Sequence, residues 1–136
     1  MSEAPGPELV ELAHQMFDLA RAGEGERLAA HVDAGVPADL TDASGNTLLM
    51  LAAYHGHAAT VALLVARGAD PDRVNDRGQS PLAGAVFKDE QDVVQALLSV
   101  GADPDAGSPT ARETAAMFGR PGLFDPSEGR GAAKKQ

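Results

Sequence analysis

The sequence contains no cysteine and no tryptophan, and aromatic residues make up only 4% of it. The absence of cysteine excludes a disulfide framework and a thiolate nucleophile, and it leaves only histidine and carboxylate ligands for a zinc site. No stretch approaches the roughly 18 consecutive apolar residues of a membrane-spanning helix. The start, from Met1 to Glu8, is acidic and unlike a secretory signal, so we expect a cytoplasmic protein that does not enter a membrane.

Basic residues are also scarce. The chain has 11 Lys and Arg against 20 Asp and Glu, which gives a formal net charge of −9. The basic residues are scattered along the chain, so a polyanion would be repelled and no nucleic-acid partner is expected. Two interpretations of the acidic surface stay open. It either keeps a small protein soluble or steers a basic partner.

What the sequence does contain is a repeat. The segment Gly68–Asp72 recurs as Gly101–Asp105, 33 positions later (101 − 68), and a weaker copy begins 33 positions earlier at Gly35. The apolar trio Val61, Leu64 and Val65 returns as Val94, Leu97 and Leu98 with i, i+3, i+4 spacing, which places one apolar stripe on a helix. Such a period predicts stacked helical units, and an apolar content dominated by Ala, Leu and Val predicts close packing of helix backbones.

Each unit is expected to hold two short helices. In the second unit the turn before Thr47 leads into a helix up to Tyr54, with the Thr47 hydroxyl near its first turn. Gly56 ends that helix in the left-handed conformation, and a second helix runs from about Ala58 to Ala66.

The other units vary this plan. In the third unit, Asp89 replaces the glycine, so its turn is expected to be built differently, with Asp92 as a candidate cap of the next helix. The first unit is expected to open with a longer helix from about Glu8 to Ala22. In the fourth, the second helix shrinks to Pro121–Phe124, as suits an end unit that faces solvent.

The pattern resembles that of the ankyrin-repeat family. The second unit carries the matching residues Asp42, Gly45, Thr47, Leu49, Ala52, Ala53, Gly56, His57, Leu63, Leu64, Gly68, Ala69 and Asp70. The third matches at Gly78, Ser80, Pro81, Leu82, Ala85, Leu97, Leu98, Gly101, Ala102 and Asp103. Met50 and Ala83 replace the usual His, Leu48 the usual Pro, and Gly84 weakens a helix by roughly 1 kcal/mol relative to Ala.

The resemblance implies an all-α solenoid of about four helix-turn-helix units with protruding turns. We expect a repeat domain over residues 8–124, with units at about 8–41, 42–74, 75–105 and 106–124, between flexible ends at 1–7 and 125–136. It also implies that the chain binds another protein through its concave face. The family's contact positions fall on these turn tips and inner-helix ends: Ser44, Asn46, Tyr54, His55, Arg77, Gln79, Phe87, Lys88, Met117 and Phe118.

Tyr54, Phe87 and Met117 occupy equivalent places, so they are expected to form a row that Phe118 extends. Exposed aromatic and Met side chains are typical binding anchors. The alternative is that Phe87 and Phe118 belong to the core between units.

Catalytic signatures are missing, and no cofactor is expected. The histidine pair at 55 and 57 lacks further metal ligands, and we interpret His57 as structural. The paired aspartates of the repeats suit turn stabilisation, and the chain has no phosphate loop or nucleophile elbow.

We therefore expect no enzyme activity. The sequence favours an adaptor or regulator that is monomeric when isolated. An acidic inhibitor or immunity-type protein that neutralises a basic enzyme, and a structural subunit of a larger complex, are the alternatives.

Overall fold

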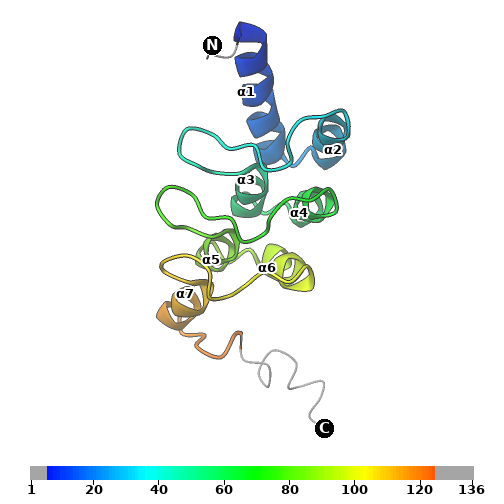
Figure 1. Ribbon diagram of the computed structural model, residues 1–136. Coiled ribbons are helices and arrows are strands. Elements are labelled where there is room, and N and C mark those ends of the chain that lie inside the picture. The colour runs from blue at the N-terminus through cyan, green and yellow to red at the C-terminus, as the bar shows by residue number, and fades with distance from the viewer. Residues whose placement is uncertain (1–5, 125–136) are drawn as a thin grey trace.

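The computed structural model describes residues 6–124. Helices α1, α3, α5 and α7 are stacked in an inner column, and α2, α4 and α6 form an outer column beside it (Figure 1). The expected all-α repeat solenoid is confirmed. Within the described residues there are seven helices: α1 Pro7–Ala22, α2 Gly25–Asp33, α3 Leu48–Tyr54, α4 Ala58–Val65, α5 Pro81–Phe87, α6 Gln91–Ser99 and α7 Ala111–Met117.

A side-chain hydroxyl begins each of the inner helices α3, α5 and α7. The Thr47 Oγ1 accepts a hydrogen bond from the Met50 N–H at 3.0 Å, and the Ser80 Oγ accepts one from Ala83 at 3.1 Å. Thr110 does the same for α7, where the Glu113 side chain also accepts from the Thr110 N–H. These caps satisfy N–H groups that have no partner within the helix, which fixes where each helix starts.

The ends of the inner helices correct one expectation. Gly56 is left-handed as predicted, with φ of 82°, but Asp89 is left-handed too, with φ of 58°. The turn after α5 is therefore built like the turn after α3, because aspartate tolerates this conformation better than most residues. Asp92 is not the cap of α6 either: Glu90 holds the N-cap position, without a side-chain capping bond.

The core lies between the two columns and along the inner one. All six residues from Leu48 to Ala53 are buried, because α3 is covered by α1, α5 and α4. Ala52 and Ala53 are fully buried and leave room for neighbouring backbones. Burying a leucine such as Leu49 stabilises the fold by about 1.5–3 kcal/mol, so the stack depends on each unit having neighbours.

The last unit has a single helix. Residues 121–124 form a turn, and Leu123 and Phe124 pack partly buried against the core, in place of a full second helix. The flexible ends predicted at 1–7 and 125–136 fall largely outside the described residues, although Pro7 already begins α1.

Candidate functional site

The protruding turns before α3 and α5 are each organised by one side chain. The Asp42 carboxylate accepts hydrogen bonds from the backbone N–H groups of Ser44 and Asn46, both at 2.9 Å. One period later, Asn75 Oδ1 accepts from the N–H groups of Arg77 and Gln79, both at 3.0 Å. These bonds hold the turns rigid, so the exposed Ser44 and Arg77 are presented on a fixed frame.

The hydrogen bonds to Asp42 also set its ionisation. Burial raises the pKa of the carboxyl group, but the hydrogen bonds from Asn46 and Ser44, together with the positive charge of Arg21, hold the pKa below its usual value of 3.8. Asp42 is therefore ionised at neutral pH.

Successive turns are joined to one another. The Asp76 N–H donates to the Ser44 carbonyl at 3.0 Å, and the Ser108 N–H donates to the Gly78 carbonyl at 2.8 Å. Between them, Asn75 Nδ2 donates to Asn46 Oδ1 at 2.8 Å and to Gln79 Oε1 at 2.7 Å. The amides of Asn46 and Gln79 are thus engaged within the fold, through the buried Asn75. Sequence reasoning missed Asn75, although it stands one period after Asp42.

The ends of the inner helices bring the other predicted residues together. We call Tyr54, His55, Phe87, Lys88, Met117 and Phe118 the inner-helix row. Phe87 is 61% exposed, Met117 68% and Phe118 52%, which rules out the alternative that the two phenylalanines are core residues. The rings of Phe87 and Phe118 meet edge to face, with centroids 5.7 Å apart. Exposed apolar side chains in contact form a patch that a partner can cover.

Tyr54 behaves differently from its equivalents. It is partly buried, and its ring lies where a β-carbon of Gly84 would stand, so the glycine makes room for the ring. The Lys88 Nζ lies 5.6 Å from the centre of the same ring, within range of a cation–π interaction. The Tyr54 ring therefore supports the Lys88 ammonium group from below and keeps it close to the exposed Phe87.

The two histidines are used for hydrogen bonding. His57 Nε2 donates to the Arg21 carbonyl at 2.7 Å, which ties α1 to the following unit and confirms its structural role. His55 Nδ1 donates to the Leu51 carbonyl of its own helix at 2.9 Å. Among residues 6–124 no three His, Asp or Glu side chains are grouped to hold a metal ion.

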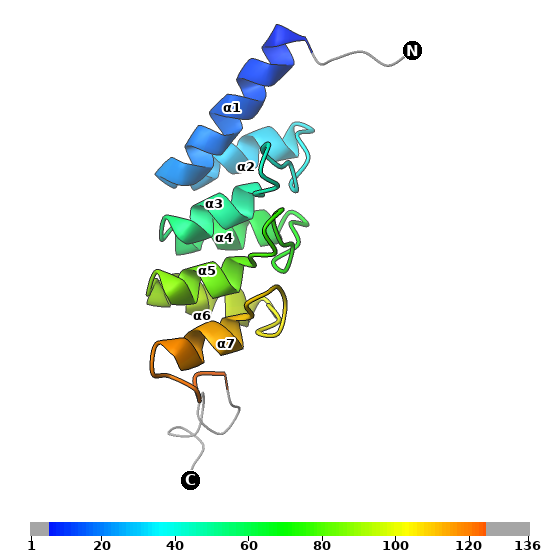
Figure 2. The same cartoon turned by 90° about the vertical axis from the view of Figure 1, so that its left-hand side faces the viewer.

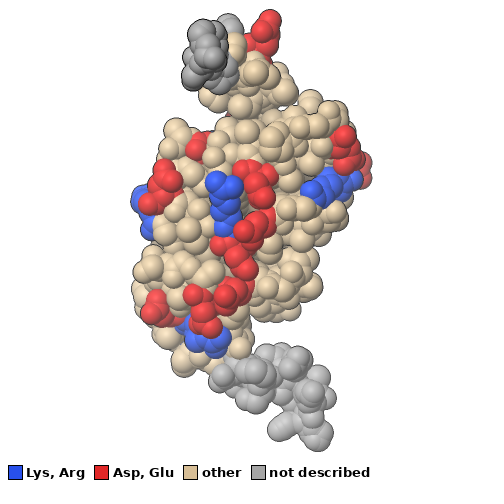
Figure 3. Space-filling model, viewed as in Figure 1, with Lys and Arg blue, Asp and Glu red and all other residues tan. Residues whose placement is uncertain are grey.

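The paired aspartates stabilise turns, as predicted. Within the turns, Asp70 accepts a hydrogen bond from the Asp72 N–H and Asp103 accepts one from the Asp105 N–H, both at 2.9 Å. Across unit boundaries, Asp39 accepts one from the Asp70 N–H at 3.0 Å and Asp72 accepts one from the Asp103 N–H at 2.7 Å. Figure 3 shows acidic side chains gathered down the middle of this face, with a few basic ones beside them.

A column of bonded turns, an exposed apolar row and stacked helix pairs define a helical-repeat module of the kind that binds other proteins. Residues 16–108 match a family model described as ankyrin repeats in three copies. The chain belongs to the ankyrin-repeat family.

A protein of Pseudomonas aeruginosa named as an ankyrin repeat protein is 49% identical over 67 residues, which cover 46% of this chain and 39% of that relative. The matched part of this chain thus spans well under half of the relative's length. In the described part of the chain, no helix has the length and apolar character needed to cross a membrane.

Proposed function

We propose that this protein is an adaptor or regulator that binds a cytoplasmic protein through the inner-helix row and the protruding turns. The observation that carries the proposal is the exposure of Phe87, Met117 and Phe118 at neighbouring positions. Between residues 6 and 124 only Leu9, Val10 and Val74 are comparable exposed apolar side chains. Desolvating such a cluster against a complementary surface supplies most of the affinity in typical interfaces.

Lys88 adds a positive charge at one place on this apolar surface, which can fix the orientation of a partner. Its ammonium group lies over Tyr54, and within the described residues it forms no ion pair. A partner carboxylate placed beside Phe87 can therefore pair with Lys88. Partial burial of that pair in the complex would make the contact specific as well as attractive.

The test uses the full chain as bait in an extract of its native cells. Wild type is compared with Phe87→Asp and with Ala62→Asp, which places the same charge on an exposed position of the outer helix α4. A partner retained by wild type and Ala62→Asp but lost with Phe87→Asp supports the proposal. A partner retained by all three refutes the role of the row.

An acidic inhibitor of a basic enzyme is a second candidate, favoured by the net charge of −9 and the strip of carboxylates. Such a complex would weaken steeply as salt is added, because exposed charges are screened beyond roughly 8 Å at physiological ionic strength. Binding through the inner-helix row would depend little on salt. Measuring affinity from 50 mM to 500 mM salt therefore separates the two candidates.

A further inference from the structure

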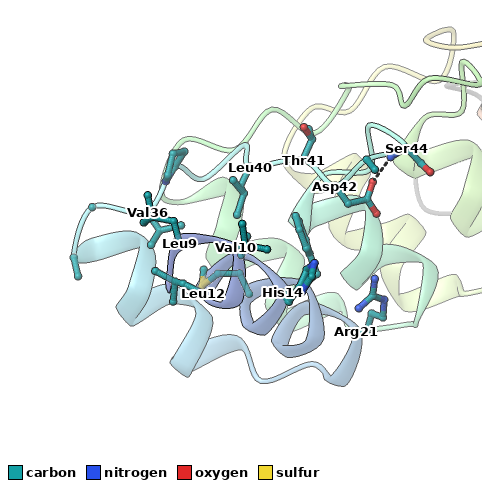
Figure 4. A pocket seen from close by; sticks show the side chains of 17 residues that line it. Leu9, Val10, Leu12, His14, Arg21, Val36, Leu40, Thr41, Asp42 and Ser44 are labelled. Atoms are coloured by element: carbon teal, nitrogen blue, oxygen red, sulfur yellow. Dashed lines mark hydrogen bonds between the residues drawn. The ribbon is translucent and has the colours of Figure 1, made fainter. Parts of the chain in front are cut away.

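A groove with a volume of about 800 Å³ lies between α1, from Leu9 to Arg21, and the loop from Ala34 to Ser44. Leu9, Val10 and Leu12 line it from α1, and Val36 and Leu40 line it from the loop (Figure 4). Leu9 is 61% exposed and Val10 43%. The groove is thus an apolar surface at the opposite end of the stack from Phe118. Of the contact positions predicted from the sequence, only Ser44 is among the residues that line it.

The groove exists because α1 departs from the repeat. Lower in the stack each protruding turn lies beneath another turn, through the bonds from Asp76 to Ser44 and from Ser108 to Gly78. Above the turn of residues 42–46 there is instead the 16-residue helix α1, whose N-terminal half slopes away from the turns (Figure 2). The upper edge of this turn therefore faces the groove.

The upper edge of this turn carries a backbone N–H equivalent to one that forms a turn-to-turn hydrogen bond in the next unit. Ala43 stands one period before Asp76, whose N–H donates to the turn above it. The Ala43 N–H makes no hydrogen bond with residues 6–124, and Ala43 lines the groove. The Ala43 N–H therefore faces the groove as an unused donor, and a carbonyl group of a bound molecule could accept from it as the Ser44 carbonyl accepts from Asp76.

The charged side chains near Ala43 indicate which charge a molecule bound in the groove would carry. Asp42, His14 and Arg21 line that end, and Arg21 is paired with Asp18 at 2.9 Å. Arg21 attracts both Asp18 and Asp42, so the two carboxylates outnumber the one guanidinium group and this end has a net negative charge. A fatty-acid headgroup would be repelled here, whereas a basic side chain would be attracted.

We propose that the groove binds an extended or turn-forming segment of a partner polypeptide. An apolar side chain of the segment lies between Val10 and Leu40, its backbone carbonyl accepts from the Ala43 N–H, and an adjacent Lys or Arg faces Asp42. The volume suits several side chains rather than one. The proposal goes beyond the inner-helix row and does not depend on it.

The test selects random 12-residue peptides displayed on phage against the immobilised full chain. We expect enriched peptides in which apolar residues adjoin Lys or Arg. Their affinity should fall at least tenfold with Val10→Glu and stay unchanged with Phe87→Asp. In amide-resolved spectra of the wild type, the Ala43 N–H should shift downfield and exchange more slowly with solvent when peptide is bound.

Three results would overturn the proposal. Enriched peptides that lose binding with Phe87→Asp but not with Val10→Glu would place recognition on the inner-helix row, so that the proposed function stands and the groove fails. A selection that enriches no peptide, or enriches acidic ones for the groove, would contradict the chemistry assigned to it. Circular dichroism of Val10→Glu confirms that the variant is folded.

Discussion

The ring of Tyr54 occupies the space that a β-carbon would need at Gly84 of the following unit. The missing side chain of this glycine lets an aromatic ring from α3 approach the α5 backbone closely. The same ring carries the Lys88 ammonium group at 5.6 Å. The sequence alone indicates a glycine that weakens its helix, and the structure shows what the glycine permits.

Gly84→Ala should destabilise the protein although alanine favours helices by about 1 kcal/mol over glycine. The new methyl group must displace the Tyr54 ring, and overpacking of this kind costs about 1–3 kcal/mol. Urea denaturation measures the difference. In a Tyr54→Ala background the same substitution should become stabilising, and an unchanged sign in that background would contradict the packing described.

His57→Ala should lower the free energy of unfolding by about 1 kcal/mol, because it removes the bond to the Arg21 carbonyl across two units. His55→Ala is the matched control, since its bond stays within its own helix and its side chain is exposed. Thermal melts of both variants test this. A larger loss with His55→Ala would be inconsistent with the role assigned to His57.

The protein should lose stability in acid partly through Asp42. The pKa of Asp42 is lowered in the folded state, so its contribution is present above the unfolded value of about 3.8 and is lost as pH falls through the folded pKa. Urea denaturation between pH 6 and pH 2.5 measures the slope.

Asp42→Asn supplies the control for this pH dependence. Asn75 holds the equivalent turn with a neutral side chain, so asparagine can accept the same backbone bonds at position 42. The variant should fold and should show a shallower loss below pH 4. A slope equal to that of wild type would show that Asp42 does not contribute to it.

Asp89→Gly should stabilise the protein by up to about 1 kcal/mol, because glycine adopts a φ of 58° without the strain that a side chain causes. The ion pair lost with Arg120 is exposed and long, at 3.8 Å, so it contributes little. Gly56→Ala is the reciprocal change and should destabilise. If thermal melts show that Asp89→Gly lowers stability, the Asp89 side chain must make a contact that stabilises the fold by more than the backbone strain costs.

The fold could be predicted from sequence because its signals are local and recur at 33 residues. A hydroxyl such as Thr47 starts a helix and a glycine such as Gly56 ends it, whatever the neighbouring units do. The exposure of the inner-helix row could not be predicted in the same way. Tyr54 and Phe87 hold equivalent positions, yet Tyr54 is partly buried because of Gly84 in the next unit. Phe87 is 61% exposed, and its ring contacts that of the exposed Phe118.

The groove was also beyond sequence reasoning. It depends on the slope of α1 relative to the first protruding turn, which no periodic pattern records. The apolar residues Leu9 and Val10 could equally have belonged to the buried face of the long first helix.

The most direct test of the central claim is the dissociation constant of the purified partner, measured by calorimetry with wild type, the Phe87→Asp/Met117→Asp double variant and Ala62→Asp. Phe87 and Met117 are suited to this test because their exposure separates binding from folding, which the packing of Tyr54 does not. We predict that the double variant binds at least thirtyfold more weakly with an unchanged melting temperature, and that Ala62→Asp binds like wild type. Equal affinity of all three proteins would contradict recognition through the inner-helix row.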